Sequence, residues 1–179
     1  MPTYQIHPLS DDAQAQACAA FMAQSDPWLT LGVDYPSLLR TVLAPQRERF
    51  VALADGQLAG LLLLNLQGTF AGYLQTLCVA PAFRGLGCGS ALVAFAEHRI
   101  FQHHANVFLC VSSFNHAAYR LYERLGYTRV GEIPDFLVAG YSELLLRKTR
   151  GPLSTFKPSA QAPAPGTPAA PQPGPLVLG

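Results

Sequence analysis

Apolar and polar positions divide residues 1–150 into a first run of strands and a later alternation of strands with helices. Near-continuous apolar runs are typical of buried strands, whereas apolar residues that recur every three to four positions are typical of helices. Strands are expected at residues 3–7, 49–55, 57–66, 69–79, 106–112, 127–133 and 142–148. Helices are expected at residues 12–22, 36–43, from the glycines at 85–89 to about 102, and 115–125.

Capping and turn residues support this division. Asp11 or Asp12 can cap the first helix, and Gly126 suits the position just after the last one. Asp55-Gly56 between two apolar runs predicts a β-hairpin. Strands in hairpin order, followed by strands that alternate with helices, predict an α/β or α+β protein with a mixed sheet.

The composition changes near residue 151. Residues 151–179 hold eight of the chain's 15 prolines and one charged residue, Lys157. Proline lacks a backbone donor and disfavours helix at the residue before it. We therefore expect one domain at residues 1–150 and a disordered, partly polyproline-II tail at residues 151–179. A role of this tail as a ligand for another protein is left open.

The overall composition excludes several classes of function. Half of the residues are hydrophobic, 13% are charged and the formal net charge is +1. Such a balance provides no electrostatic basis for binding nucleic acid or an anionic membrane. No apolar run is long enough to span a membrane, and the first residues lack the pattern of a secretory signal. We expect a cytoplasmic protein.

Cysteine and histidine positions do not indicate a metal site or a disulfide framework. The four cysteines are widely spaced, at positions 18, 78, 88 and 110, so free thiols are expected. His98, His103 and His104 lie near the end of a predicted helix, without cysteine or carboxylate partners at ligand spacing. We expect no metal.

Three glycines, Gly85, Gly87 and Gly89, follow Arg84 between a predicted strand and a predicted helix. The free N–H groups of a helix N-terminus, with its partial positive charge, bind phosphate oxygens. Glycine lets the backbone approach the anion, and an arginine adds donors for it. The stretch therefore predicts a diphosphate cradle. The competing interpretation is that the glycines only permit close packing of strand against helix.

The motif distinguishes among known phosphate-binding loops. A P-loop requires Gly-Lys followed by Ser or Thr, whereas Ser90 follows Gly89 directly. The dinucleotide fingerprint GxGxxG fits poorly, because the glycines fall as GxGxG. The pattern RxxGxG, met by Arg84, Gly87 and Gly89, resembles the signature of the GNAT superfamily of acyl-CoA-dependent N-acyltransferases.

A second stretch, residues 115–133, resembles the other signature of that superfamily. Asn115 opens a predicted helix, Tyr122 follows seven residues later, and Leu125-Gly126-Tyr127 matches the family's LGF/LGY helix end. The resemblance covers roughly residues 3–149 and is closest to the RimI-like branch. It implies a mostly antiparallel seven-stranded sheet with about four helices, splayed between its fourth and fifth strands.

The resemblance also implies acetyl-CoA as cosubstrate, attacked directly by an acceptor amine. Tyr122 would be the general acid that protonates the departing thiolate, since a phenol stays protonated at neutral pH. An oxyanion would form near backbone N–H groups of the fourth strand. The residues implied in cosubstrate binding are Leu77, Cys78, Val79, Arg84, Gly85, Leu86, Gly87, Cys88, Gly89, Ser90 and Asn115.

The general base is where this chain departs from the family pattern. RimI-like enzymes carry a glutamate five residues before the motif asparagine, where this chain has Cys110. Another frequent carboxylate position holds Gln75. Glu143, Asp135 or a relayed water are the remaining candidates. A thiol in an apolar strand has a raised pKa, so Cys110 is a weak base candidate.

The acceptor is expected at the loop that follows the first helix. Trp28, Tyr35, Asp26 and Asp34 would suit a cationic acceptor, with Trp28 as a core residue an equal alternative. The resemblance implies an acceptor that is a primary amine of a small molecule or a peptide. A non-catalytic acyl-CoA-binding module is the alternative function, and an interaction protein that acts through its tail is a third. The oligomeric state stays open, with a homodimer among the options.

Overall fold

The computed structural model describes residues 2–159. Its strands are β1 (Gln5–Pro8), β2 (Glu48–Ala54), β3 (Gln57–Asn65), β4 (Tyr73–Val79), β5 (Asn106–Ser112), β6 (Thr128–Pro134) and β7 (Ser142–Thr149). Its α-helices are α1 (Asp12–Ala23), α2 (Tyr35–Leu43), α3 (Cys88–Phe101) and α4 (His116–Arg124), with a short 3₁₀ helix at Pro81–Phe83.

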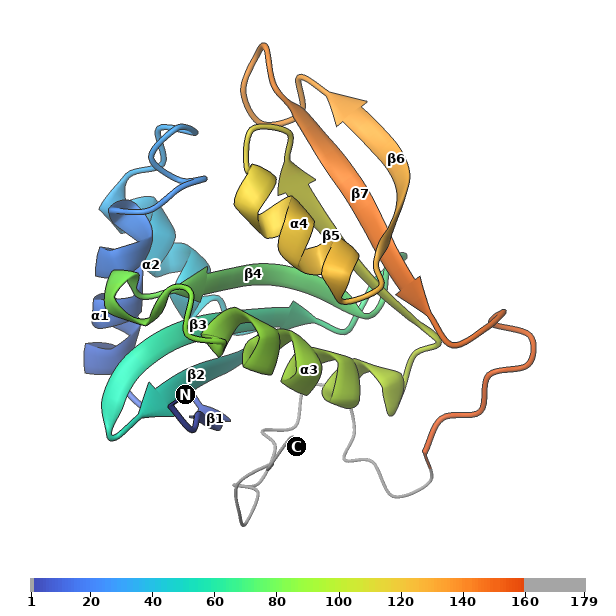
Figure 1. Ribbon diagram of the computed structural model, residues 1–179, viewed down its shortest axis with the longest axis horizontal. Helices are drawn as coiled ribbons and strands as arrows, with labels where there is room; N and C mark the ends of the chain where they lie inside the picture. The colour runs from blue at the N-terminus through green and yellow to red at the C-terminus, as the bar shows by residue number, and fades with distance from the viewer. Residues whose placement is uncertain (1, 160–179) are drawn as a thin grey trace.

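All seven strands form one sheet in the order β1-β2-β3-β4-β5-β7-β6. Every neighbouring pair is antiparallel except β4 and β5, which run parallel. Along that parallel pair, Tyr73 and Phe108 are the single matched pair of the ladder. Beyond this point the two strands diverge (Figure 1). The mixed sheet and its splay between the fourth and fifth strands are confirmed.

The apolar run of β3 is buried on both faces of the sheet, which is why it does not alternate with polar residues. Leu62 and Leu64 belong to a core formed with α3 and α4, whereas Leu61 and Leu63 belong to a second core formed with α1 and α2. All four leucines have no exposed surface. Each contributes roughly 1.5–3 kcal/mol to the free energy of unfolding. The sheet therefore separates two helical layers (Figure 1).

Local capping sets the helix boundaries. Asp11 accepts a hydrogen bond from the backbone of Gln14 at the start of α1, and Gly126 adopts a φ of +85° after α4. Both roles were predicted. The expected start of the fourth strand at residue 69 is wrong. Gly72 has a φ of +87°, and a Cβ built there would lie 2.5 Å from the Asn106 carbonyl oxygen, so regular strand begins only at Tyr73.

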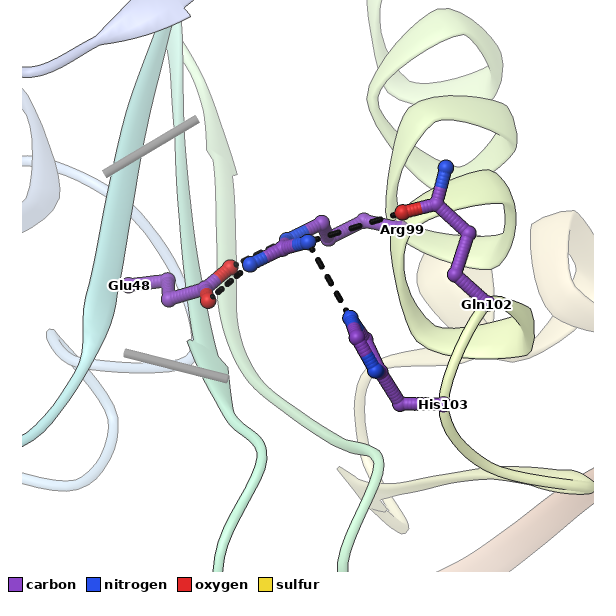
Figure 2. A network of polar contacts seen from close by, with 4 residues as sticks. All are labelled: Glu48, Arg99, Gln102 and His103. Atoms are coloured by element: carbon purple, nitrogen blue, oxygen red, sulfur yellow. Dashed lines mark hydrogen bonds and ion pairs between the residues drawn. The ribbon is translucent and has the colours of Figure 1, made fainter. Parts of the chain in front are cut away.

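A buried ion pair joins α3 to the start of β2. The Arg99 guanidinium donates to Glu48 twice, from Nε to Oε2 at 2.8 Å and from Nη2 to Oε1 at 2.6 Å (Figure 2). The two side chains are 4% and 7% exposed. Gln102 and His103 also contact the guanidinium, at 3.5 and 3.3 Å from its Nη1. No local pattern in the sequence predicts this pairing, because its partners are 51 positions apart.

Residues 151–159, the first part of the expected tail, include a contact with the end of α3. Thr155 donates its backbone N–H to the Pro152 carbonyl, and Ser159 donates to the Gln102 carbonyl at 2.8 Å. The rest of the predicted tail, residues 160–179, lies outside the described residues. The four cysteines are free thiols, as expected. No helix within residues 2–159 is long and apolar enough to cross a lipid bilayer.

Candidate active site

The glycine loop connects β4 to the N-terminus of α3. Gly85 and Gly87 adopt left-handed φ values of +73° and +89°, and Gly87 is the N-cap of the helix. The first helical hydrogen bond runs from the Ala91 N–H to the Gly87 carbonyl. The N–H groups of Cys88, Gly89 and Ser90 therefore have no helical acceptor, as at any helix start. With the helix dipole behind them, they have the donors and the partial positive charge that an anion-binding site needs.

The three glycines serve different purposes. A Cβ built at Gly85 would meet no atom within 4 Å, so a ligand can approach the backbone there. A Cβ built at Gly89 would lie 3.2 Å from Leu121 Cδ2 on α4. Gly89 thus permits close packing of α3 against α4, whereas the competing interpretation of the motif was packing of strand against helix. Gly85 and Gly87 provide the left-handed turn, and Gly85 also leaves open space beside the backbone.

Hydrogen bonds of other groups in the loop hold it against the rest of the protein. Arg84 donates from Nε to the Val79 carbonyl at 3.3 Å and from Nη2 to Ser25 Oγ at 2.5 Å. The Leu86 carbonyl accepts from the Tyr4 hydroxyl, and Cys88 is buried with its thiol 3.6 Å from the Ala59 carbonyl. The role predicted for Arg84 towards an anion stays a prediction.

A cavity of about 320 Å³ occupies the gap between β4 and β5. Because β4 pairs with β5 only at Tyr73, the β5-facing edge of residues 75–79 has no strand partner. Trp28 and Leu38 line the cavity from the layer of α1 and α2, and Ala118 and Tyr122 line it from α4. Residues from both helical layers therefore line the cavity.

Three of the predicted site residues line this cavity, namely Leu77, Asn115 and Tyr122. The alternation along β4 places Cys78 instead in the core with α1 and α2. Val79 packs against the other core. The structure thus brings β4 and α4 together in the wall of the cavity. The side chains of Cys78 and Val79 do not line it.

Asn115 and Tyr122 hold the positions on α4 that their spacing predicts. Asn115 is the N-cap, and its Oδ1 accepts from the Ala118 N–H at 3.1 Å. Tyr122 is 6% exposed and makes an edge contact with Tyr127, with ring centroids 5.5 Å apart. Burial raises the pKa of the Tyr122 phenol above its ordinary value, so its hydroxyl carries a proton throughout the neutral range. It can donate that proton into the cavity.

The two carboxylate candidates for the general base, Glu143 and Asp135, differ in their position relative to the cavity. Glu143 lines the cavity together with Gln75 and Cys110. Burial raises the pKa of the Cys110 thiol, which keeps it protonated. Asp135 does not line the cavity, and its Oδ1 accepts from the Gly140 N–H in the loop between β6 and β7.

The acceptor side of the cavity differs from the expectation. Trp28 both lines the cavity and packs against the core with α1 and α2, so its two interpretations hold together. Asp26 and Asp34 do not line the cavity. Asp26 accepts from the Thr30 hydroxyl, and Asp34 caps α2 by accepting from the Ser37 N–H. Neither is therefore placed to attract a cationic acceptor.

Several cavity residues escape prediction from the sequence. Arg47 lines the cavity and donates to the Thr41 carbonyl, and Tyr73 lies at the point where the sheet opens. Phe136 and Leu137 reach the cavity from the loop between β6 and β7 and are 60% and 54% exposed. Two adjacent apolar residues in a segment expected to be a loop were the signal in the sequence that could have identified them. In residues 2–159, no group of three histidine, cysteine or carboxylate side chains is arranged to hold a metal ion.

The sequence is similar to known acetyltransferases. The model of the acetyltransferase (GNAT) family matches residues 13–127. N-alpha-acetyltransferase RimI of Mycobacterium tuberculosis is 32% identical over 147 residues, which cover 78% of this chain and 89% of that protein.

Solved structures share the fold. Aminoglycoside 6'-N-acetyltransferase complexed with coenzyme A superposes with a TM-score of 0.66 at 18% identity, covering 82% of this chain and 97% of that one. The Salmonella typhimurium protein yncA, solved with acetyl-CoA, gives 0.67 at 18% identity, over 87% and 98% of the two chains. The ribosomal-protein-S18-alanine N-acetyltransferase of Escherichia coli gives 0.64 at 16% identity, over 82% and 93%.

Proposed function

The chain belongs to the acetyltransferase (GNAT) family and is an acyl-CoA-dependent N-acetyltransferase, and from this premise we propose how it works and what it acetylates. It transfers the acetyl group of acetyl-CoA to a primary amine in a ternary complex. The observation that carries this proposal is the placement of two features along β4. The glycine loop follows the C-terminal end of β4, and the unpaired part of the same strand lines a cavity that the buried Tyr122 also lines.

Residues 84–90 hold the diphosphate of the cosubstrate in this proposal. The backbone N–H groups at the start of α3 bind its oxygens, and the open space beside Gly85 lets them approach. The unpaired edge of β4, from Gln75 to Val79, binds the amide groups of the pantetheine arm, with Asn115 on the opposite wall. Acetyl-CoA supplies an activated thioester carbonyl to the cavity. The residues present fit this group.

Tyr122 acts as the general acid. Its side chain lines the cavity, and its buried phenol keeps a proton at neutral pH. It gives this proton to the departing sulfur, which would otherwise leave as an unstable thiolate in a partly apolar site. A backbone N–H near Val79 stabilises the negative charge that develops on the carbonyl oxygen.

The acceptor is an amine carried on an apolar group, in a small molecule or at a peptide N-terminus. Apolar side chains line the acceptor side of the cavity, namely Leu31, Val33, Leu38, Phe136 and Leu137. Among its described lining residues, Glu143 is the one carboxylate, which suits a single amine better than a polycation. The relative that is 32% identical is named as an N-alpha-acetyltransferase, which supports a peptide α-amine.

Release of coenzyme A thiol in the presence of a panel of amines tests this function. We expect turnover with peptides that begin with a small or apolar residue, and intersecting initial-velocity patterns, as a ternary complex requires. Parallel patterns would overturn direct transfer. Tight acetyl-CoA binding without turnover on any amine would favour the alternative, a non-catalytic acyl-CoA-binding module.

The proposal also covers the domain boundaries, the location and the oligomeric state of the enzyme. The domain spans residues 1–150, followed by the tail at residues 151–179. The free thiols of all four cysteines support a cytoplasmic location, because such thiols persist in reducing compartments. A homodimer through β6 is supported by its position at the edge of the sheet and by the exposed side chains of Val130 and Ile133. Light scattering at micromolar concentration distinguishes a dimer from a monomer.

A further inference from the structure

A buried carboxylate lies in the wall of the cavity, on a strand that follows both sequence motifs. Glu143 on β7 is 6% exposed and lines the cavity that Tyr122 also lines. The register of β5 with β7 pairs Glu143 with Ser112, and Cys110 with Leu145. The carboxylate therefore reaches the cavity from β7, the strand next to β5. Its partner Ser112 is the next residue after Cys110 on the same face of β5.

The carboxylate is held by one hydrogen bond. Ser112 Oγ donates to Glu143 Oε1 at 2.5 Å. No hydrogen bond joins Oε2 to another described residue, and Oε2 is not among the fully buried unsatisfied atoms of residues 2–159. The serine thus holds one oxygen of the carboxylate and leaves the second without a protein donor among residues 2–159. A base needs this arrangement, with one oxygen held and the other accessible.

The groups that face Glu143 do not neutralise it. Tyr73 on β4 and Cys110 on β5 lie close enough to interact with its charge, and both are neutral at pH 7 because burial raises their pKa values. Arg47 lines the same cavity but forms no ion pair with Glu143 in the described structure. Burial without a cationic partner raises the pKa of Glu143 towards the neutral range, where a general base is most effective.

We propose that Glu143 is the general base of the reaction, replacing from β7 the carboxylate that β5 lacks at Cys110. This inference rests on the proposed function. Glu143 takes one proton from the acceptor's ammonium group, directly or through a water, and later releases it to solvent. The freed amine forms the C–N bond with the thioester carbonyl carbon while the C–S bond breaks. Tyr122 protonates the sulfur and regains a proton from the acylated nitrogen, so the balance is one amide, one thiol and one released proton.

The test compares Glu143→Gln with the matched control Asp135→Asn. The glutamine keeps the shape and the Ser112 hydrogen bond, and Asp135 is the nearby carboxylate that does not line the cavity. We expect kcat at pH 7 to fall about 10²- to 10⁴-fold in Glu143→Gln, with the loss shrinking at high pH, where the amine deprotonates without help. Asp135→Asn should keep the wild-type profile. A Glu143→Gln enzyme with the wild-type pH profile would overturn the proposal.

Two further measurements do not depend on turnover. Calorimetry should give the same acetyl-CoA affinity for Glu143→Gln and wild type, because the carboxylate acts at the acceptor. A carbon-13 NMR titration of side-chain-labelled protein should show one carboxyl with a pKa above the ordinary glutamate value, absent in Glu143→Gln. Loss of acetyl-CoA binding in the variant, or an ordinary pKa for that carboxyl, would contradict the inference.

The results also separate this inference from the proposed function. A wild-type enzyme that acetylates no amine removes the proposed function. An active wild type whose Ser112→Ala and Glu143→Gln variants both keep the wild-type pH profile removes only the role of Glu143. We expect Ser112→Ala to be intermediate, with a lower kcat and a displaced acid limb, because the carboxylate loses its orienting donor.

Discussion

The Arg84 guanidinium, at the start of the glycine loop, donates to the Ser25 hydroxyl at the end of α1, 59 positions earlier in the chain. Ser25 is 2% exposed, and its Oγ donates onward to the Phe21 carbonyl at 2.6 Å. Trp28, three residues later, lines the acceptor side of the cavity. Hydrogen bonds therefore join the glycine loop to the C-terminal end of α1, three residues before Trp28.

Replacement of Arg84 by alanine should weaken both substrates. We expect a loss of acetyl-CoA affinity of about 10- to 100-fold by calorimetry, since a charge-assisted donor contributes about 1.5–3 kcal/mol. The KM for the acceptor amine should also rise, because the loop at Trp28 loses its tie to Arg84. Ser25→Ala is the matched control and should raise the acceptor KM with a smaller effect on acetyl-CoA. An Arg84→Ala enzyme with both constants unchanged would show that the chain of contacts carries no coupling.

Substitution of Gly87 by aspartate should abolish cosubstrate binding. The new side chain would need a left-handed φ of +89° and would place a negative charge at the helix N-terminus that binds the phosphates. We expect a loss of affinity of about 100-fold or more, because like charges in contact cost several kcal/mol. Gly68→Asp carries the same strain, at a φ of +88°, away from the site and should bind normally. Equal affinities for the two folded variants would refute the phosphate role of the loop.

Removal of the Tyr122 hydroxyl should affect chemistry and spare binding. We expect Tyr122→Phe to lower kcat by about 10²-fold, at the lower end of the range for a general acid. The ring would keep its contact with Tyr127, so the acetyl-CoA dissociation constant should not change. Since burial raises the pKa of Tyr122, the wild type should keep this proton up to at least about pH 10. Wild-type turnover in the variant would remove Tyr122 from the mechanism.

The Arg99–Glu48 pair should matter for stability more than any surface pair. Glu48→Gln leaves the buried guanidinium without its counter-charge, which costs about 3–5 kcal/mol of the free energy of unfolding. Glu132→Gln is the control, because its partner Arg129 is 45% exposed and such pairs contribute at most about 1 kcal/mol. Urea denaturation measures both. Similar midpoints for the two variants would mean that solvent reaches the buried pair.

Deletion of residues 160–179 should leave acetyl transfer and stability unchanged. The deletion keeps Ser159, whose N–H donates to the Gln102 carbonyl at the end of α3. Steady-state constants and the thermal midpoint of the shortened chain provide the comparison. A loss of activity on peptide acceptors alone would assign the tail a role in recognising them.

The elements and the cradle could be predicted because their signals are local. The hairpin at Asp55-Gly56, the apolar run of β3 and the glycines that precede α3 each lie within one continuous stretch. The spacing of Asn115 and Tyr122 likewise predicts a shared helix face, and both residues line the cavity. Short-range chemistry sets these features, so a single sequence is enough to find them.

The rest of the site depends on register between distant segments. Glu143 reaches the cavity only because β7 pairs with β5 in a way that aligns it with Ser112, 31 positions earlier. Nothing near Glu143 in the sequence distinguishes it from Asp135. Asp34 shows the opposite error, since a local interpretation as the cap of α2 was available, three residues before Ser37, and would have excluded it from the acceptor site.

The opening of the sheet beyond Tyr73 and Phe108 has one more consequence. Unpaired strand edges usually invite other chains to add to them, and proteins suppress this at the outer borders of their sheets. Here two such edges lie in the interior of the sheet, between layers of helices, and not at its outer border where a strand of another molecule could add. The same unpaired N–H and C=O groups that would promote aggregation at an outer edge are therefore available here to a narrow, extended ligand bound between β4 and β5.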